Sequence, residues 1–291
     1  MLLALVVIVF TLTRMSGSPA ALLLPGDATA QDVQELETRL GLREPVPVQF
    51  VKYVMAAMTG DLGKSLRTKR PVVDMFMERL PATLQVLFIG MLIMSIGVPL
   101  GLVAALTRGS GIDLAVRLIS SVGMSVPSFW LGTVLALVLG VWLHLLPVAG
   151  RSGWESAIMP AISLSMYAMA GVARLMRSSM LQVLGQDYIF FARAKGLPER
   201  KVLLKHALRN ALIPVVSFTS IVIVTQFLLG AVVIETVFAW PGVGYLAFQS
   251  LVQRDYPVLQ GVVLLMGVVF ILANLAVDLL YGVLDPRIRH G

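Results

Sequence analysis

Long apolar stretches alternate with short polar segments along most of this chain. Five stretches without a charged residue cover residues 80–107, 118–150, 156–173, 210–234 and 256–277. Each is close to or above the roughly 20 residues that an α-helix needs to cross a bilayer. A charged residue at the centre of such a helix costs about 2.5–3.5 kcal/mol on insertion scales. The pattern therefore predicts an all-α, polytopic membrane protein.

The N-terminal residues supply a sixth apolar stretch, which we expect to be a shortened first transmembrane helix. Residues 1–14 contain an uncharged run from Leu2 to Thr13 that ends at Arg14. A secretory signal peptide is the competing interpretation, but no basic region precedes the run and no clean small-residue cleavage site follows it. With the five longer stretches, this segment brings the expected number of transmembrane helices to six.

Residues 15–79 form one polar insertion, which we expect on the extracytoplasmic side. Residues 29–40 and 48–58 show the apolar spacing of short helices, and Gly41 is a suitable stop for the first of them. The insertion holds eight acidic and eight basic residues and is neutral overall. Long translocated loops are largely exempt from the charge bias that orients membrane proteins, so these charges do not oppose the expected side.

One motif in the insertion ends like a phosphate-binding loop. Residues 60–65 read GDLGKS, but the full pattern requires glycine five positions before Gly63, where this chain has Met58. We also expect no β-strand before the motif, and no other stretch of the sequence matches the pattern. The sequence therefore predicts a chain without a nucleotide site of its own.

Basic residues are distributed unevenly over the expected topology. The polar segments after residue 107, after residue 173 and after residue 278 are expected on one side of the membrane, and together they contain twelve basic and four acidic residues. The segments expected on the opposite side, around Gly150 and Arg254, are nearly neutral. Cytoplasmic loops are enriched in lysine and arginine, so we expect both termini to be cytoplasmic. The net charge of +7 comes mostly from this asymmetry. It favours the anionic lipid bilayer and a protein partner over nucleic acid.

Composition excludes several kinds of chemistry. The chain is 57% hydrophobic and 13% charged, about half the charged fraction of a soluble domain. It contains no cysteine, so disulfides and thiolate metal sites are excluded. Its three histidines have no carboxylate at an informative spacing. We therefore expect no catalytic residues, no metal site and no enzymatic activity on this chain.

A basic segment between two apolar stretches, residues 187–214, predicts a helix–turn–helix. We expect Asp187 to cap a helix over 188–195, and Gly196 to end it in the left-handed conformation. Pro198 suits the first position of a second helix, where Glu199 complements the positive end of the helix dipole.

The second helix of this segment is expected to have two faces. Four apolar residues recur at helical spacing, and three basic residues fall four apart on another face. The apolar set is Leu204, Leu208, Ala211 and Leu212, and the basic set is Lys201, Lys205 and Arg209. Charge pattern alone leaves open whether this is a docking platform, a solvated basic face or a membrane-surface helix.

The same segment resembles the cytoplasmic EAA loop of ABC importer permeases of the dipeptide/oligopeptide/nickel branch. The resemblance rests on DYIFFARAKG (187–196) and LKHALRNALIPV (204–215), with Phe190 and Phe191 where the founding pattern has Glu and Ala. It extends over most of the chain. Further matching stretches are LPATLQ (80–85), SVPSFWLG (125–132), ETVFAWPGVG (235–244), RDYPVLQG (254–261) and NLAVDLLYGVLDPRIRHG (274–291).

The resemblance implies a permease core over 80–291 in which 187–214 forms coupling helices that contact an ATPase. The implied coupling residues are Asp187, Phe191, Ala192, Arg193, Ala194, Lys195, Gly196, Leu197, Pro198, Lys201 and Lys205. It further implies a multi-pass subunit of a bacterial inner-membrane importer that moves peptides or a similar small solute by alternating access. The implied partners are a second permease subunit, two cytoplasmic ATPases and an extracytoplasmic solute-binding protein. ATP and Mg would be bound by the ATPases, and no cofactor is expected on this chain.

Four residues are candidates for lining a solute pathway. Glu235 is an outer gate or a partner of loop backbone, and Gln226 lines the path or bonds across helices. Trp240 belongs to an aromatic belt or to a loop that dips toward the pathway mouth, and Asn274 lies on a helix face near the chain end.

Two questions stay open in the sequence. An ion-gradient-driven secondary transporter is the alternative function, although such proteins often show internal repeats, and we find no convincing one here. Peptides, glutathione-like compounds, opines and nickel complexes are all candidate solutes.

Overall fold

The computed structural model describes residues 6–8, 10–11, 29–39, 43–223, 225 and 228–284. Within these residues the regular elements are helices, and the remaining pairing is a single antiparallel bridge between Lys64 and Pro71. The predicted all-α class is therefore confirmed. Most of the expected first helix at 1–14, the stop at Gly41 and the candidate Gln226 lie outside the described residues.

Three described helices are long and apolar enough to cross a membrane, and a bent pair supplies a fourth candidate. They are Val72–Leu106, Glu155–Leu184 and Tyr256–Ala276, with the pair Gly111–Ser125 and Ser128–Trp142. The predicted stretch 210–234 corresponds to α12 (Leu208–Val222) and α13 (Leu228–Val237), between which part of the chain is not described. The count of six transmembrane helices stays a prediction.

Two helices begin before the apolar runs that predicted them. α5 (Val72–Ser95) begins inside the predicted insertion and is continued by α6 (Gly97–Leu106). α7 (Gly111–Ser125) begins after Ser110, whose Oγ accepts the Asp113 N–H at 3.3 Å. Hydrophobicity marks the part of a helix that fits an apolar layer, whereas its start is set by capping. The apolar runs therefore underestimated the length of both helices at their N-terminal ends.

The predicted run 118–150 is not one straight helix. α7 ends at Ser125, and Val126 and Pro127 are extended, with ψ of 124° and 139°. α8 (Ser128–Leu135) and the π-helix η1 (Ala136–Trp142) then continue at an angle of 106° to α7. Pro127 has no N–H to donate, and proline disfavours the helical conformation of the residue before it. The break follows from this one residue.

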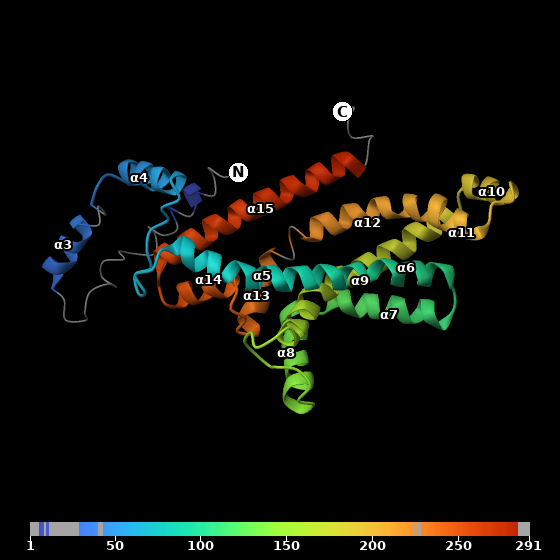
Figure 1. Cartoon of the computed structure of the whole chain (residues 1–291), viewed down its shortest axis with the longest axis horizontal. Helices are drawn as coiled ribbons and strands as arrows, with labels where there is room; N and C mark the ends of the chain where they lie inside the picture. The colour runs from blue at the N-terminus through green and yellow to red at the C-terminus, as the bar shows by residue number, and fades with distance from the viewer. Residues whose placement is uncertain are drawn as a thin grey trace. The chain divides into compact units, whose positions relative to one another are not determined.

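The chain divides into two compact units, of which the larger is Ala82–Trp240. α9 (Ile158–Leu184) is its central helix, and α6, α7, α8, α12 and α13 pack around it (Figure 1). Gly97 and Gly101 of α6 lie against the backbone of α9, where an added Cβ would meet the carbonyl oxygens of Met169 and Ala173 at 2.5 and 2.3 Å. Small residues allow such close helix contacts in membrane proteins.

The other unit comprises residues 1–81 and 241–291. The two helices predicted in the insertion are present as α3 (Ala30–Arg39) and α4 (Val46–Met58). α14 (Val243–Val252) packs on α15 (Tyr256–Leu284). The apolar core of this unit consists of Val72, Phe76, Val243, Leu246, Val258 and Val262.

Close packing of α6 on α9 makes a stability prediction. Replacing Gly101 with valine is expected to destabilise the fold by about 1–3 kcal/mol or more, because overpacking forces backbone shifts. Gly111→Val is the matched control, since nothing lies within 4 Å of a Cβ at Gly111. Unfolding in mixed micelles, followed by circular dichroism, measures both variants. Equal stability of the two would contradict the close contact.

Candidate functional site

The structure contains the predicted helix–turn–helix, which we call the platform (residues 187–214). It consists of α10 (Asp187–Ala194), α11 (Glu199–Lys201), the π-helix η3 (Val202–Ala207) and the start of α12. In Figure 1 the platform helices lie at the same end of the larger unit as the turn between α6 and α7. Gln186 occupies the capping position without a capping hydrogen bond from its side chain, and Asp187 is the first helical residue. The prediction that Asp187 caps α10 was therefore wrong by one residue.

Gly196 ends α10 as predicted, in the left-handed conformation with φ of 76°. Its N–H donates to Arg193 O at 2.9 Å, and the Leu197 N–H donates to Ala192 O at 3.4 Å. This pair of bonds is the Schellman arrangement, which satisfies carbonyls left free at a helix end. Leu197 then packs against the core of the larger unit. The turn is therefore fixed by the backbone of Gly196 and by the burial of the residue after it.

An ion pair ties the two platform helices together. Arg193 donates from Nε and Nη2 to the two carboxylate oxygens of Glu199, at 3.1 and 2.6 Å. The hydrogen bond between them lowers the pKa of the Glu199 carboxyl and raises the pKa of the Arg193 guanidinium. Pro198 caps α11 with φ of −61° and ψ of 138°, one position before the helical position predicted for it. Arg193 is thus neutralised within the chain.

The apolar face predicted for the second helix is partly wrong. Leu204 is 50% exposed, whereas Val202, Ala207 and Ala211 are buried. A π-helix bonds each residue to the fifth one along the chain, one more than in an α-helix. The buried positions of η3 are therefore five apart, at 202 and 207. A pattern of 3.6 residues per turn therefore misplaces Leu204. Lys201, Lys205 and Arg209 of the predicted basic face are all exposed.

The outward surface of the platform combines aromatic rings with cations. Phe190 and Phe191 are 69% and 62% exposed and contact each other edge to face at 6.3 Å. On the inner side, Ile189 and Ala192 are buried. The exposed cations, for which the described residues provide no ion pair, are Lys195, Arg200, Lys201, Lys205 and Arg209. Exposed aromatic residues beside cations are typical of a protein-binding surface.

The remaining platform residues support this surface. Tyr188 accepts a hydrogen bond at its hydroxyl from Asn210 Nδ2 at 2.7 Å, which joins α10 to α12. Asp187, Ala194 and Pro198 are exposed. Three contacts therefore hold the platform together: the turn at Gly196, the Arg193–Glu199 pair and the Asn210–Tyr188 hydrogen bond. The two phenylalanine rings and the cations named above are exposed.

Two of the pathway candidates are buried within the larger unit. Glu235 is 1% exposed, and its Oε1 accepts the Thr83 hydroxyl at 2.6 Å. Trp240 is also buried, and its Nε1 donates to Ala82 O at 2.9 Å. Asn274 is half-buried on α15, in the other unit, and Gln226 is not described. In this structure Glu235 and Trp240 fasten α13 and the following turn to α5, and their roles in a pathway stay predictions.

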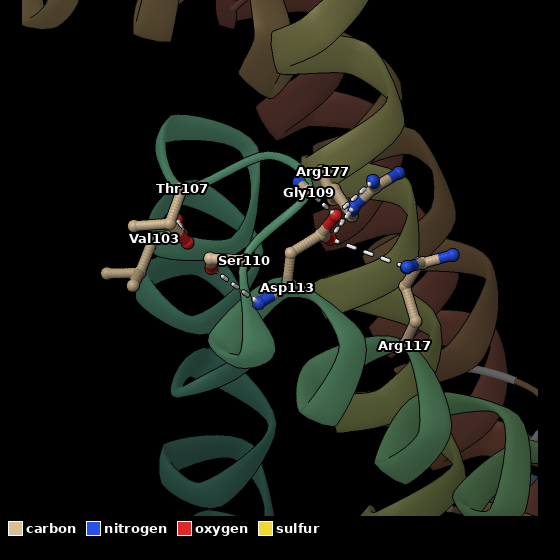
Figure 2. A network of polar contacts seen from close by, with 7 residues as sticks. All are labelled: Val103, Thr107, Gly109, Ser110, Asp113, Arg117 and Arg177. Atoms are coloured by element: carbon tan, nitrogen blue, oxygen red, sulfur yellow. Dashed lines mark hydrogen bonds and ion pairs between the residues drawn. The ribbon is translucent and has the colours of Figure 1, made fainter.

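Sequence reasoning missed a charge cluster in the larger unit. Figure 2 shows Asp113 of α7 facing Arg177 of α9, with Nε and Nη2 of Arg177 at 2.5 and 2.9 Å from the two carboxylate oxygens. The Gly109 N–H donates to the same carboxylate at 3.0 Å, and Arg117 lies at 3.5 Å. Asp113 is buried. Arg177 was counted only as a topology charge, and no local spacing links residues 64 positions apart.

This cluster positions the end of α9 that leads into the platform. Arg177 lies two turns before the end of α9 at Leu184, and α10 begins at Asp187. The bidentate geometry fixes the orientation of a guanidinium as well as its distance. The cluster therefore joins the turn between α6 and α7 to the helix that carries the platform.

Comparisons with known proteins agree with these observations. The family "Binding-protein-dependent transport system inner membrane component" matches residues 97–290, and the family of N-terminal parts of such membrane components matches residues 1–87. The dipeptide transport system permease protein DppB of Escherichia coli K12 is 40% identical, over 88% of this chain and 85% of that protein. The oligopeptide transport system permease protein AppB of Bacillus subtilis 168 is 37% identical, over 99% and 95%. The glutathione transport system permease protein GsiC of Escherichia coli K12 is 41% identical, over 98% and 93%.

Solved structures share the fold at lower sequence identity. An inward-facing structure of the methionine ABC transporter MetNI matches 73% of this chain and 97% of its own, with a TM-score of 0.60 and 21% identity. A structure described as an amino acid ABC transporter with histidines matches 74% of this chain and 94% of its own, with a TM-score of 0.55 and 18% identity. These likenesses support the all-α membrane fold.

The Asp113–Arg177 pair makes a second stability prediction. Asp113→Ala is expected to cost about 1–3 kcal/mol, because it leaves a half-buried guanidinium without its acceptor. Arg117→Ala is the control, because Arg117 is exposed and lies farther from the carboxylate, and ion pairs of exposed side chains contribute about 0–1 kcal/mol. Both are measured by unfolding in mixed micelles. A loss for Asp113→Ala no larger than that for Arg117→Ala would contradict the structural role of the pair.

Proposed function

Because the chain belongs to the family of binding-protein-dependent transport system inner membrane components, we propose that it moves di- or oligopeptides, or a similar small solute, by alternating access. The family makes it a multi-pass permease subunit of an ABC importer. Relatives named for dipeptide, oligopeptide and glutathione transport support a peptide-like solute. The proposed location is a bacterial inner membrane with both termini in the cytoplasm, as the charge asymmetry favours.

The observation that carries the proposal is the outward surface of the platform. Phe190 and Phe191 are exposed on a short helix whose end is fixed at Gly196, and exposed lysines without an ion pair among the described residues lie on the same platform. We propose that this surface sits on one of two cytoplasmic ATPase subunits. A second permease subunit, related or identical, and an extracytoplasmic solute-binding protein complete the proposed importer.

ATP acts in this mechanism through the partner and not through the chain itself. A ligand shifts a conformational equilibrium only by its different affinity for the two states. The GDLGKS motif lacks the first glycine of a phosphate-binding loop, so ATP and Mg are assigned to the ATPase subunits. Closure of the ATPase pair displaces the platform, and the platform displaces α9.

Reconstitution tests the proposal directly. The permease chains and ATPase subunits are placed in proteoliposomes, and uptake of a labelled dipeptide is measured with the solute-binding protein present. ATP-dependent uptake that stops when the ATPases are omitted is the expected result. Uptake by the permease chains alone on an ion gradient would favour the secondary-transporter alternative and overturn the proposal.

Gly196 provides a test of coupling. Gly196→Val strains the turn by about 1–2 kcal/mol, because side chains other than hydrogen disfavour positive φ. We expect lower uptake per ATP hydrolysed, with membrane insertion unchanged. Gly150→Val is the matched control, because Gly150 also has positive φ (79°) and open space around a Cβ but lies outside the platform. Coupled uptake equal to wild type in Gly196→Val would contradict the role of the turn.

The free lysines provide a test of docking. Lys195→Glu combined with Lys201→Glu is expected to weaken co-purification of the ATPase, more strongly at low salt than at moderate salt, because exposed charges are screened. Arg193 is left intact, since its reversal would also repel Glu199. Arg108→Glu is the control, an exposed cation in the turn between α6 and α7. Undiminished association at both salt concentrations would mean that the lysines serve only as topology signals.

A further inference from the structure

The GDLGKS motif lies in a tightly folded loop, residues 61–71, whose centre is a buried serine. The Ser65 hydroxyl donates to Asp255 Oδ2 at 2.5 Å and accepts the N–H groups of Arg67 and Thr68 at 3.2 and 2.9 Å. The other carboxylate oxygen of Asp255 accepts the Leu66 N–H at 3.0 Å. Both Ser65 and Asp255 are buried. The residues that resemble a phosphate site are therefore used to fix the loop.

Backbone bonds close the same loop at its base. The Ser65 N–H donates to Arg70 O at 2.9 Å, and the Val72 N–H donates to Gly63 O at 3.1 Å. Arg67 Nε donates to Gln253 O at 3.1 Å. The loop is thus anchored to the turn at 253–255, which belongs to the same unit, and its backbone is held in one conformation.

Exposed cations lie on this anchored loop and on the turn that anchors it. Lys64, Arg67, Lys69 and Arg254 are exposed, and none forms an ion pair in the described part of the chain. Arg70 is the exception, because it pairs with Glu78. We call the four unpaired residues the basic knob.

Two other cations of the insertion, Arg43 and Lys52, pair with carboxylates. Arg43 lies 3.5 Å from Glu37, and Lys52 lies 2.6 Å from Glu44. The four cations of the basic knob, in contrast, lie on backbone that is held by hydrogen bonds. A pre-organised charged surface costs less to bind than a loose one and increases the rate of encounter with a partner of opposite charge.

We propose that the basic knob docks an acidic face of the extracytoplasmic solute-binding protein. The inference rests on the proposed function and on the expected extracytoplasmic side of residues 15–79 and of the segment around Arg254. A fixed backbone favours a protein partner over lipid headgroups, because attraction of a basic segment to an anionic surface requires charge and no particular backbone geometry. Binding to anionic lipid is the alternative outcome of the test.

The experiment measures affinity between the assembled importer in nanodiscs and the purified solute-binding protein of the same system. Lys64→Glu with Lys69→Glu is expected to weaken the affinity about tenfold, mainly through slower association. Arg43→Gln with Lys52→Gln is the control: it removes two positive charges from the same insertion without repelling Glu37 and Glu44, and its affinity is expected to stay near wild type. An equal loss of affinity for the solute-binding protein in the two double variants would overturn the proposal.

A second variant separates geometry from charge. Asp255→Asn makes the loop more positive by one charge but weakens its anchor, so we expect lower affinity, whereas charge alone would raise it. Assembly with the ATPases checks that each variant is folded. Unchanged or higher affinity in Asp255→Asn would overturn the role of the fixed loop.

Lipid composition and transport distinguish the remaining outcomes. The measurement is repeated in zwitterionic nanodiscs and in nanodiscs that contain anionic lipid. A loss of affinity that occurs only with anionic lipid would assign the basic knob to lipid and overturn the docking proposal. If wild type transports with ATP and binds its partner while the charge reversal has no effect, this inference fails alone. If wild type shows no ATP-driven transport, the proposed function fails with it.

Discussion

Contact between the backbones of α6 and α9 is the constraint on which the larger unit depends. Lipid tails are as apolar as leucine, so helices in a membrane associate through close packing and hydrogen bonds more than through the hydrophobic effect. Gly97 and Gly101 leave no room for a side chain against α9. α9 is consequently the buried helix of the unit, and the elements that carry the platform begin where α9 ends.

The sequence predicted the features that depend on local chemistry. Apolar runs located the long helices, and Gly196 ended α10 because glycine accepts positive φ. It failed where a second element decides the outcome. Leu204 is exposed because η3 is a π-helix, and Asp113 meets Arg177 because α7 packs against α9. Periodicity within one helix contains neither piece of information.

Some cations of this chain pair with its own carboxylates, and others stay exposed without such a partner. Arg177, Arg193 and Arg70 each pair with a carboxylate of the chain itself, as suits a planar group with several fixed donors. Five lysines and four arginines on the platform and the basic knob are exposed and have no ion pair in the described part of the chain. Counting basic residues gave the expected orientation of the chain, but only the pairing separates the cations that stabilise the fold from those available to bind.

Stiff and interrupted elements occupy different places in the proposed mechanism. α9 is an unbroken helix of 27 residues, about 40 Å long at 1.5 Å per residue, and it joins the platform at its end. Its neighbours are interrupted, α7 from α8 at Pro127 and α11 from α12 by η3. In the proposed mechanism, a displacement of the platform travels along α9, and the breaks are the points at which the surrounding helices change direction. Both kinds of break, proline and the π-helical turn, weaken a helix locally.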